Sequence, residues 1–375
     1  MKRIIAITFL NYFVSGGLTL IIPLLLLYRN VSLAEIGIVI SILPLVFLLA
    51  RMLFAALADQ VGWAPIFILL NWPATLISTA IYFFANSVPA FFLGKTVEGA
   101  KESAYWAVNR TAIFSLSPKK EEREATRINA VIWLSTAIGS AVAGIGLAYL
   151  GFSSTLGIML IASAVIGIPA AFLWNTWKKD AKPRTQNVVA LLDPRGRDKT
   201  FWLVSFALLF NSLATYPLIT LLLPVFMDQQ LAYDYLSIGL AFMLYNILAA
   251  VVTILTLKKP LGVRRVVVQS LIALIATFLL ADSGLYFPAL FLALAVTRGL
   301  GIGFFESMIA KVTKNRSTVS VDIGLLHIPT RLAEFASVLS AGFIAQSLGY
   351  LPVFAASGIF FTIFSVLSLH VLKLQ

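Results

Sequence analysis

The feature that most limits how this sequence can fold is its series of apolar segments, each long enough to cross a lipid bilayer. A span needs roughly 20 predominantly apolar residues. Inside hydrocarbon the backbone must satisfy its own hydrogen bonds, so we expect each segment to form an α-helix. About twelve such spans are predicted, at 4–28, 33–57, 64–85, 88–114, 127–150, 153–176, 201–227, 233–257, 265–282, 286–312, 322–348 and 350–372.

The composition excludes a soluble globular chain. Of the 375 residues, 60% are hydrophobic and only 12% are charged, and the mean hydropathy is +0.94. A soluble domain needs a polar exterior that such a composition cannot provide. The net charge of +12 lies mostly in short connections, so it does not indicate nucleic-acid binding. The absence of cysteine excludes a thiol nucleophile and a cysteine metal site.

Lys and Arg residues are concentrated in every second connection, which predicts the topology. The basic connections are 1–3, 118–127, 178–199, 258–265, 311–316 and the end at Lys373, whereas the opposite connections contain Arg29 alone. By the positive-inside rule, both termini are expected in the cytoplasm. The apolar run that ends at Tyr28 is too long for a signal-peptide core, so we expect an uncleaved first span.

The longest polar stretch, 177–200, divides the chain into an expected bundle of six helices at 1–176 and a second at 201–375. Local matches at similar offsets indicate a duplication, and hence two pseudo-symmetric bundles. They pair Phe9-Leu10-Asn11 with Leu209-Phe210-Asn211, Pro23 with Pro224, Gly37 with Gly239, Gly62 with Gly262, Glu102 with Glu306, and Ala143-Gly144 with Ala341-Gly342.

The loop after the second span resembles the signature loop of the major facilitator superfamily, G-x-L-A-D-R-x-G-R-R. This chain has Leu57, Ala58, Asp59 and Gly62 in register, but Ala at the first glycine and no basic residue at the basic positions. A second family signature, R-x-x-x-G in the fourth span, is present as Lys95-x-x-x-Gly99. The resemblance implies the fold of an all-α integral membrane protein with inverted repeats and secondary transport by alternating access, without a cofactor.

Within that resemblance, the loop is expected to control the conformational change. Gly62 allows a tight turn, and Asp59 at a helix end can face a helix N-terminus or a cation such as Arg110. These residues are therefore candidates for a gate. The alternative is a simple topological turn with a solvated Asp59.

The fourth predicted span carries most of the charge found inside the spans of the first half. Lys95, Glu98, Glu102 and Trp106 share an arc of roughly 80°, and Lys101 falls outside it. Glu98 and Glu102 are one turn apart, so we expect that the two carboxylates are not both ionised, although Lys95 partly offsets their repulsion. We therefore predict a proton-coupling site at Lys95, Glu98, Glu102 and Trp106. The alternative is a charge cluster that ties helices together.

The second half has counterparts in its tenth and eleventh predicted spans. Arg298 and Glu306 lie in one, and His327, Arg331 and Glu334 in the other. Arg331 and Glu334 are three residues apart and can pair on their own helix. Arg298, Glu306, Arg331 and Glu334 are candidates for the substrate and coupling site, whereas His327 and Arg51 are more simply explained as structural residues. Further polar residues are candidates for the cavity lining or for contacts between helices: Asn11, Tyr12, Asn211, Tyr216, Tyr245 and Asn246.

These observations predict a secondary active transporter that moves a small solute, with proton coupling, in the lipid bilayer of the cell membrane. We expect a monomer and no metal, no enzyme activity and no nucleic-acid partner. The sequence contains no phosphate-binding glycine-rich loop with Lys-Ser/Thr and no metalloprotease motif. A facilitative uniporter, efflux or flipping of amphipathic drugs or lipids, and a non-transporting receptor are the alternatives.

Overall fold

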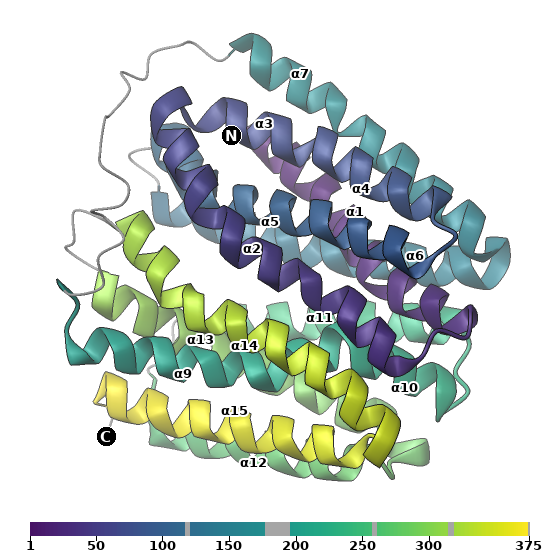
Figure 1. Cartoon of the computed structure of the whole chain (residues 1–375). Helices are drawn as coiled ribbons and strands as arrows, with labels where there is room; N and C mark the ends of the chain where they lie inside the picture. The colour runs from purple at the N-terminus through teal and green to yellow at the C-terminus, as the bar shows by residue number, and fades with distance from the viewer. Residues whose placement is uncertain (117–120, 177–195, 257–260, 314–318, 374–375) are drawn as a thin grey trace. The chain divides into compact units, whose positions relative to one another are not determined.

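A computed structural model describes residues 1–375 apart from 117–120, 177–195, 257–260, 314–318 and 374–375. The described part of the chain is helical and contains no strand (Figure 1), which confirms the predicted all-α fold class. Its elements are α1 (Lys2–Tyr28), α2 (Leu33–Val61), α3 (Trp63–Asn71), α4 (Pro73–Phe84), α5 (Val88–Leu116), α6 (Glu121–Val165), α7 (Gly167–Thr176), α9 (Lys199–Pro217), η2 (Leu218–Leu222), α10 (Leu223–Gln229), α11 (Tyr235–Thr256), α12 (Val263–Leu280), η3 (Gly284–Tyr286), α13 (Phe287–Thr313), α14 (Val319–Leu348) and α15 (Leu351–Leu372).

The described helices match the expected spans in length and polarity. Nine helical segments among them are long and apolar enough to cross a membrane. One of these, Arg127–Asn175, has 49 residues and bends at Gly151, so it has the length of two crossings. Two further helices, α5 and α14, have 29 and 30 residues but carry the charged residues discussed below. The predicted spans at 88–114 and 322–348 correspond to these two helices.

Several helices are broken or bent where the local sequence requires it. The third span consists of α3 and α4, which meet at Trp72, and Pro73 begins α4 because proline has no amide hydrogen to donate. The bend in α6 lies at Gly151, whose φ of 76° is accessible to glycine at little cost. The α9 helix ends at Pro217, and a short π-helix, η2, follows it.

Two corresponding helices, α2 and α11, begin with a side-chain cap. Ser32 and Glu35 form a capping box, in which the Ser32 amide donates to the Glu35 carboxylate at 3.1 Å and the Glu35 amide donates to Ser32 Oγ at 3.3 Å. At α11, the Ser237 amide donates to Asp234 Oδ1 at 2.8 Å. The caps support the predicted duplication, because the two halves begin these helices with related chemistry.

The chain divides into two compact units, which we describe separately. The first comprises Met1–Arg29, Ile42–Leu191 and Asp234–Met243, and the second comprises Asn30–Ser41, Leu192–Tyr233 and Leu244–Gln375. Each unit thus has most of one half of the chain and the start of one helix from the other half. Within the second unit, for example, the Ala34 amide at the start of α2 donates to Gln346 Oε1 of α14 at 3.0 Å.

Within the first unit, α1 packs most extensively against α6, and glycine makes the close approach possible. A Cβ at Gly16 of α1 would lie 2.5 Å from the carbonyl oxygen of Thr136 in α6. Next to this contact, a buried cluster around Phe67 and Tyr105 forms the apolar core of the unit. In the second unit the core lies around Phe201, Phe304 and Phe364.

The glycines Gly99 and Gly299 pack in the same way in the two halves, which shows the duplication in three dimensions. A Cβ at Gly99 of α5 would meet the Leu43 carbonyl oxygen and the Val46 side chain of α2. A Cβ at Gly299 of α13 would meet the Ala249 carbonyl oxygen and the Val252 side chain of α11. This packing aligns Gly99 with Gly299, so Glu98 and Arg298 occupy equivalent positions in the two repeats. The sequence matches paired Glu102 with Glu306, and that alignment is shifted by about one helical turn from the alignment of Gly99 with Gly299.

Candidate transport site

One buried ion pair of the first unit joins Lys95 and Glu98 on α5. The Lys95 ammonium lies 2.8 Å from Glu98 Oε2, and only 5% of each side chain is exposed. The Tyr82 hydroxyl of α4 donates to the same carboxylate oxygen at 2.8 Å. Its ring also lies beneath the Lys95 ammonium, 5.7 Å from the ring centroid. Glu98 therefore has two strong donors that favour its charged form.

A second ion pair lies one turn further along α5 and contains a lysine that the sequence interpretation left out. The Lys101 ammonium lies 2.9 Å from Glu102 Oε1 and donates to Ser15 Oγ of α1 at 2.9 Å. Only 2% of the Lys101 side chain is exposed, against 14% of the Glu102 side chain. The Tyr12 hydroxyl reaches the other oxygen of Glu102 at a longer distance, 3.4 Å.

The geometry places a cation beside each of the two carboxylates. Glu98 and Glu102 were not expected to be ionised together, with Lys95 as a partial offset, and each of them pairs with its own lysine. The difference arises because the side chain of Lys101 is long enough to reach Glu102 from outside the predicted arc. The first unit thus contains two separate buried ion pairs.

Two of the polar residues expected in the cavity lining connect helices of the first unit. The Asn11 amide of α1 donates to Asn71 Oδ1 at 3.0 Å and its oxygen accepts from the Thr75 hydroxyl at 3.0 Å, at the break between α3 and α4. Asn11 is fully buried, so these contacts fit the alternative role of joining helices. Tyr12 packs edge-on against Tyr105 as well as reaching Glu102. Trp106 is partly buried and also contacts Tyr105.

The second unit contains the predicted pair on α14. Arg331 donates to Glu334 Oε2 at 2.5 Å, and the Ser212 hydroxyl of α9 donates to the other Glu334 oxygen at 3.1 Å. Glu334 is buried, with 6% of the residue exposed. The ring of His327, one turn earlier, hydrogen-bonds the Ile323 carbonyl oxygen at 2.7 Å through Nδ1, which fits the structural role.

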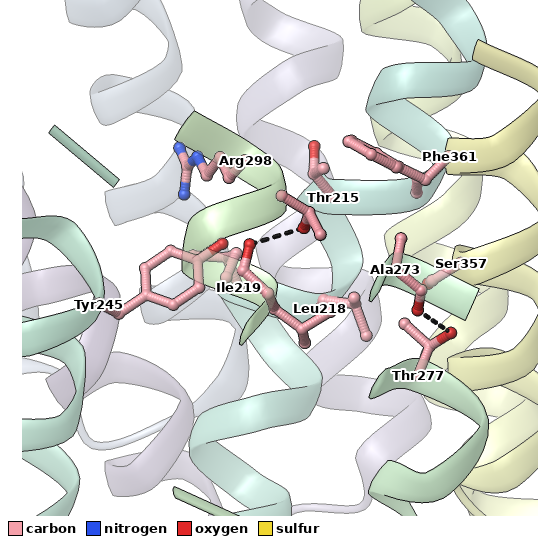
Figure 2. Close-up of a pocket in the computed structure, with 12 residues that line it drawn as sticks. Thr215, Leu218, Ile219, Tyr245, Ala273, Thr277, Arg298, Ser357 and Phe361 are labelled. Atoms are coloured by element: carbon pink, nitrogen blue, oxygen red, sulfur yellow. Dashed lines mark hydrogen bonds between the residues drawn. The ribbon is translucent and has the colours of Figure 1, made fainter. Parts of the chain in front are cut away.

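A small cavity in the second unit contains two more of the predicted residues. Tyr245 of α11 and Arg298 of α13 line one side, and Ser357 and Phe361 of α15 line the other (Figure 2). The Arg298 guanidinium lies 5.7 Å from the centroid of the Tyr245 ring. The cavity volume of about 30 Å³ is enough for about two water molecules. It is far smaller than the roughly 300–1,000 Å³ of a typical ligand pocket.

The remaining predicted residues lie in different environments. Asn246 is buried, Asn211 and Tyr216 are partly buried, and Glu306 is exposed. In the predicted gate, Gly62 has a φ of 88° and precedes α3, as the expected tight turn requires. The side chains of Asp59 and Arg110 lie outside what the structure describes. Among the described residues, no group of three or more His, Asp and Glu side chains could hold a metal ion.

Long apolar helices with ion pairs buried among them define a multi-pass membrane protein with a polar interior, the class to which many transporters belong. The sequence model of the family described as Major Facilitator Superfamily matches residues 4–316 of this chain. The chain therefore belongs to the Major Facilitator Superfamily, and it is a membrane transporter.

Two solved structures with the same fold are distant from this chain in sequence. The crystal structure of the human organic anion transporter MFSD10 (TETRAN) has a TM-score of 0.68 and 17% identity, over 98% of this chain and 99% of that chain. A bacterial homologue of the human lysosomal transporter Spinster, solved in an inward-facing and unoccupied conformation, has a TM-score of 0.74 and 15% identity, over 99% and 97%. No curated protein matches the chain.

Proposed function

We propose that the chain is a secondary active transporter that moves a small polar solute by alternating access and couples this movement to protons. The observation that carries the proposal is the pair of buried ion pairs on α5, Lys95–Glu98 and Lys101–Glu102. Charged groups inside a membrane span are costly, so their presence favours a role in binding or proton movement. Arg331–Glu334 on α14 is the corresponding candidate of the second unit.

Of the two carboxylates on α5, Glu102 is the better candidate for the proton site. Glu98 has two donors at 2.8 Å on one oxygen and its side chain is 5% exposed. Glu102 has one close lysine, a longer contact with Tyr12 and a side chain that is 14% exposed. Protonation therefore disrupts weaker contacts at Glu102 than at Glu98, and water reaches Glu102 more easily.

The proposal also covers the orientation of the chain in the membrane and its oligomeric state. The alternation of basic and neutral connections supports cytoplasmic termini in a cell membrane. A monomer is proposed, because one chain already contains both of the predicted repeats that transport by alternating access requires. The candidate gate formed by Asp59, Gly62 and Arg110 remains part of this proposal.

The test is transport by purified protein in proteoliposomes. A panel of organic anions, organic cations and zwitterions is first screened by thermal shift, and the ligands that stabilise the protein are then used in counterflow. We expect a pH gradient to drive accumulation by the wild type. Glu102→Gln should retain counterflow and lose the accumulation, because counterflow needs no net proton movement.

Glu35→Gln is the matched control for this experiment. It also replaces a glutamate of the first half, but Gln can replace Glu in the capping box, so proton-driven accumulation should remain. Glu98→Gln is measured in parallel, and loss of accumulation in this variant alone would move the proton site to Glu98. Accumulation that ignores the pH gradient would indicate a uniporter, and binding without flux would indicate a receptor.

A further inference from the structure

Of the two buried lysines of α5 described above, Lys101 has the partner with the weaker contacts. The residue is 1% exposed, and its ammonium has close contacts with Glu102 Oε1 and Ser15 Oγ, both at 2.9 Å. Ser15 is uncharged, so within this pair of contacts the compensating charge comes from Glu102. A buried ammonium that loses its counter-charge is strongly unfavourable. Glu98 also acts on Lys101 through its charge, but its carboxylate is in direct contact with Lys95 and Tyr82. Protonation of Glu102 therefore removes the carboxylate that contacts Lys101 directly, and another anion can take its place.

The neighbouring pair shows why the same does not hold for Lys95. Glu98 accepts from both Lys95 and Tyr82, and the Tyr82 ring also stabilises the Lys95 ammonium. These two donors favour the charged form of the carboxylate. Lys95 thus keeps its partner under conditions in which Lys101 can lose its own.

Other ionisable groups around Glu102 come from three helices. Tyr12 of α1 contacts Glu102 directly, and Tyr82 of α4 contacts Glu98. On α5 itself the neighbours are Lys95, Glu98 and Tyr105. The α3 helix has no ionisable residue, and the charged residues of α6 lie within its first seven residues. In α2, the Arg51 guanidinium lies over the Phe47 ring.

We propose that Lys101 binds the anionic group of the solute, a carboxylate or a monoanion of similar size, when Glu102 is protonated. The proposal rests on the proposed proton-coupled function and adds a substrate class to it. One proton on Glu102 and one monoanion on Lys101 enter together, so the net charge of the site does not change. By linkage, the proton and the anion must strengthen each other's binding by the same factor.

The experiment measures anion binding to the full-length protein in detergent by calorimetry. The probes are acetate, lactate, benzoate and nicotinate, with benzamide and nicotinamide as neutral controls. Between about pH 8 and about pH 5, we expect the affinity of the wild type for the best carboxylate to rise by about 5–150-fold. A pH dye should report uptake of about one proton per anion bound, as the linkage requires.

Three variants separate binding from folding. Glu102→Gln should bind the carboxylate with an affinity that no longer depends on pH, because Lys101 is then always without its carboxylate partner. Lys101→Gln should bind no carboxylate at any pH. If this single variant unfolds, Lys101→Gln with Glu102→Gln restores a neutral pair, and the folded double variant should also bind none.

Carboxylate binding by the double variant would overturn the proposal, as would the absence of pH-dependent binding of every anion in the wild type. Both results leave the proposed proton coupling standing, since a cation or zwitterion that accumulates with the pH gradient would still demonstrate it. Conversely, coupled uptake of a proton and an anion on binding, without flux in vesicles, would support the role of Lys101 and contradict transport.

Discussion

Lys95 and Glu98 form an ion pair of 2.8 Å on one face of α5, with 5% of each side chain exposed. A buried pair of this kind costs much desolvation, and the removal of one partner leaves the other charge uncompensated. Substitution of one partner is therefore expected to cost more stability than substitution of both.

We expect Glu98→Gln and Lys95→Met each to destabilise the protein by about 3–5 kcal/mol, because each leaves one buried charge alone. The double variant should be close to the wild type, since neither charge remains and Gln still accepts from Tyr82. Unfolding of the detergent-solubilised protein measures all three. Equal losses that simply add in the double variant would show that the two side chains are not coupled.

The close packing of α1 on α6 gives a second prediction. Gly16→Ala should destabilise the protein by about 1–3 kcal/mol, because the new Cβ would lie 2.5 Å from the Thr136 carbonyl oxygen and the helices must separate. Gly157→Ala, in α6, is the control. Its Cβ would meet only Phe83 at 3.5 Å, so this variant should be neutral or slightly more stable. Thermal unfolding that does not separate the two variants would contradict the packing argument.

The cap of α11 predicts a dependence on pH. The hydrogen bonds from Ser237 lower the pKa of Asp234, which precedes the helix and is exposed. A carboxylate with a lowered pKa stabilises the fold above its unfolded pKa of about 3.9, and this contribution is lost as the pH falls through the folded value. Asp234→Ala should therefore cost about 1 kcal/mol at neutral pH.

Below about pH 3, the same substitution should cost much less, because Asp234 is then protonated in the wild type as well. Unfolding of both proteins across this range measures the difference. Asp234→Asn is the control, since Asn is a good N-cap without a charge, and its stability relative to Ala should vary little with pH. If the difference in stability between the wild type and Asp234→Ala did not change with pH, the charged cap would be disproved.

A fourth buried pair joins the residues before α9 to α14. Arg197 Nη2 lies 2.6 Å from Asp322 Oδ1, and the Asp322 side chain is fully buried. We expect Asp322→Asn to destabilise the protein by about 3–5 kcal/mol. Lys199→Gln, an exposed cation in the first turn of α9, is the control and should change the stability by less than about 0.5 kcal/mol. A small effect of Asp322→Asn would show that Arg197 finds compensation elsewhere.

Much of the fold could be predicted because hydrocarbon leaves the backbone few choices. Each apolar stretch had to become a helix, so the fold class and the approximate positions of α5, α13 and α14 followed from hydropathy. The break at Trp72 and the π-helix after Pro217 were not predicted, because they depend on which neighbours satisfy the freed backbone groups. The repeat register at Gly99 and Gly299 also required packing, since apolar helices offer many similar matches.

The candidate site was predicted at the level of helices and less well at the level of contacts. The charged residues of α5 and α14 stood out because charge is rare in spans, and Arg331–Glu334 followed from their spacing. Tyr82, Ser15 and Ser212 were missed, since tyrosine and serine are common in helices and nothing in their spacing indicates a partner. Lys101 was set aside because a helical arc describes Cβ directions and ignores side-chain length.

The hydrogen bonds of Asn11 with Asn71 and Thr75 have a consequence for biogenesis. The interrupted third span brings polar groups to the middle of an apolar segment, and α1 supplies their partner. A nascent third span that leaves the translocon alone would expose these groups to lipid, which is unfavourable. Retention of the first span beside the insertion site until the third emerges avoids that exposure. We therefore expect the N-terminal helix to act as a template for the third span during membrane insertion.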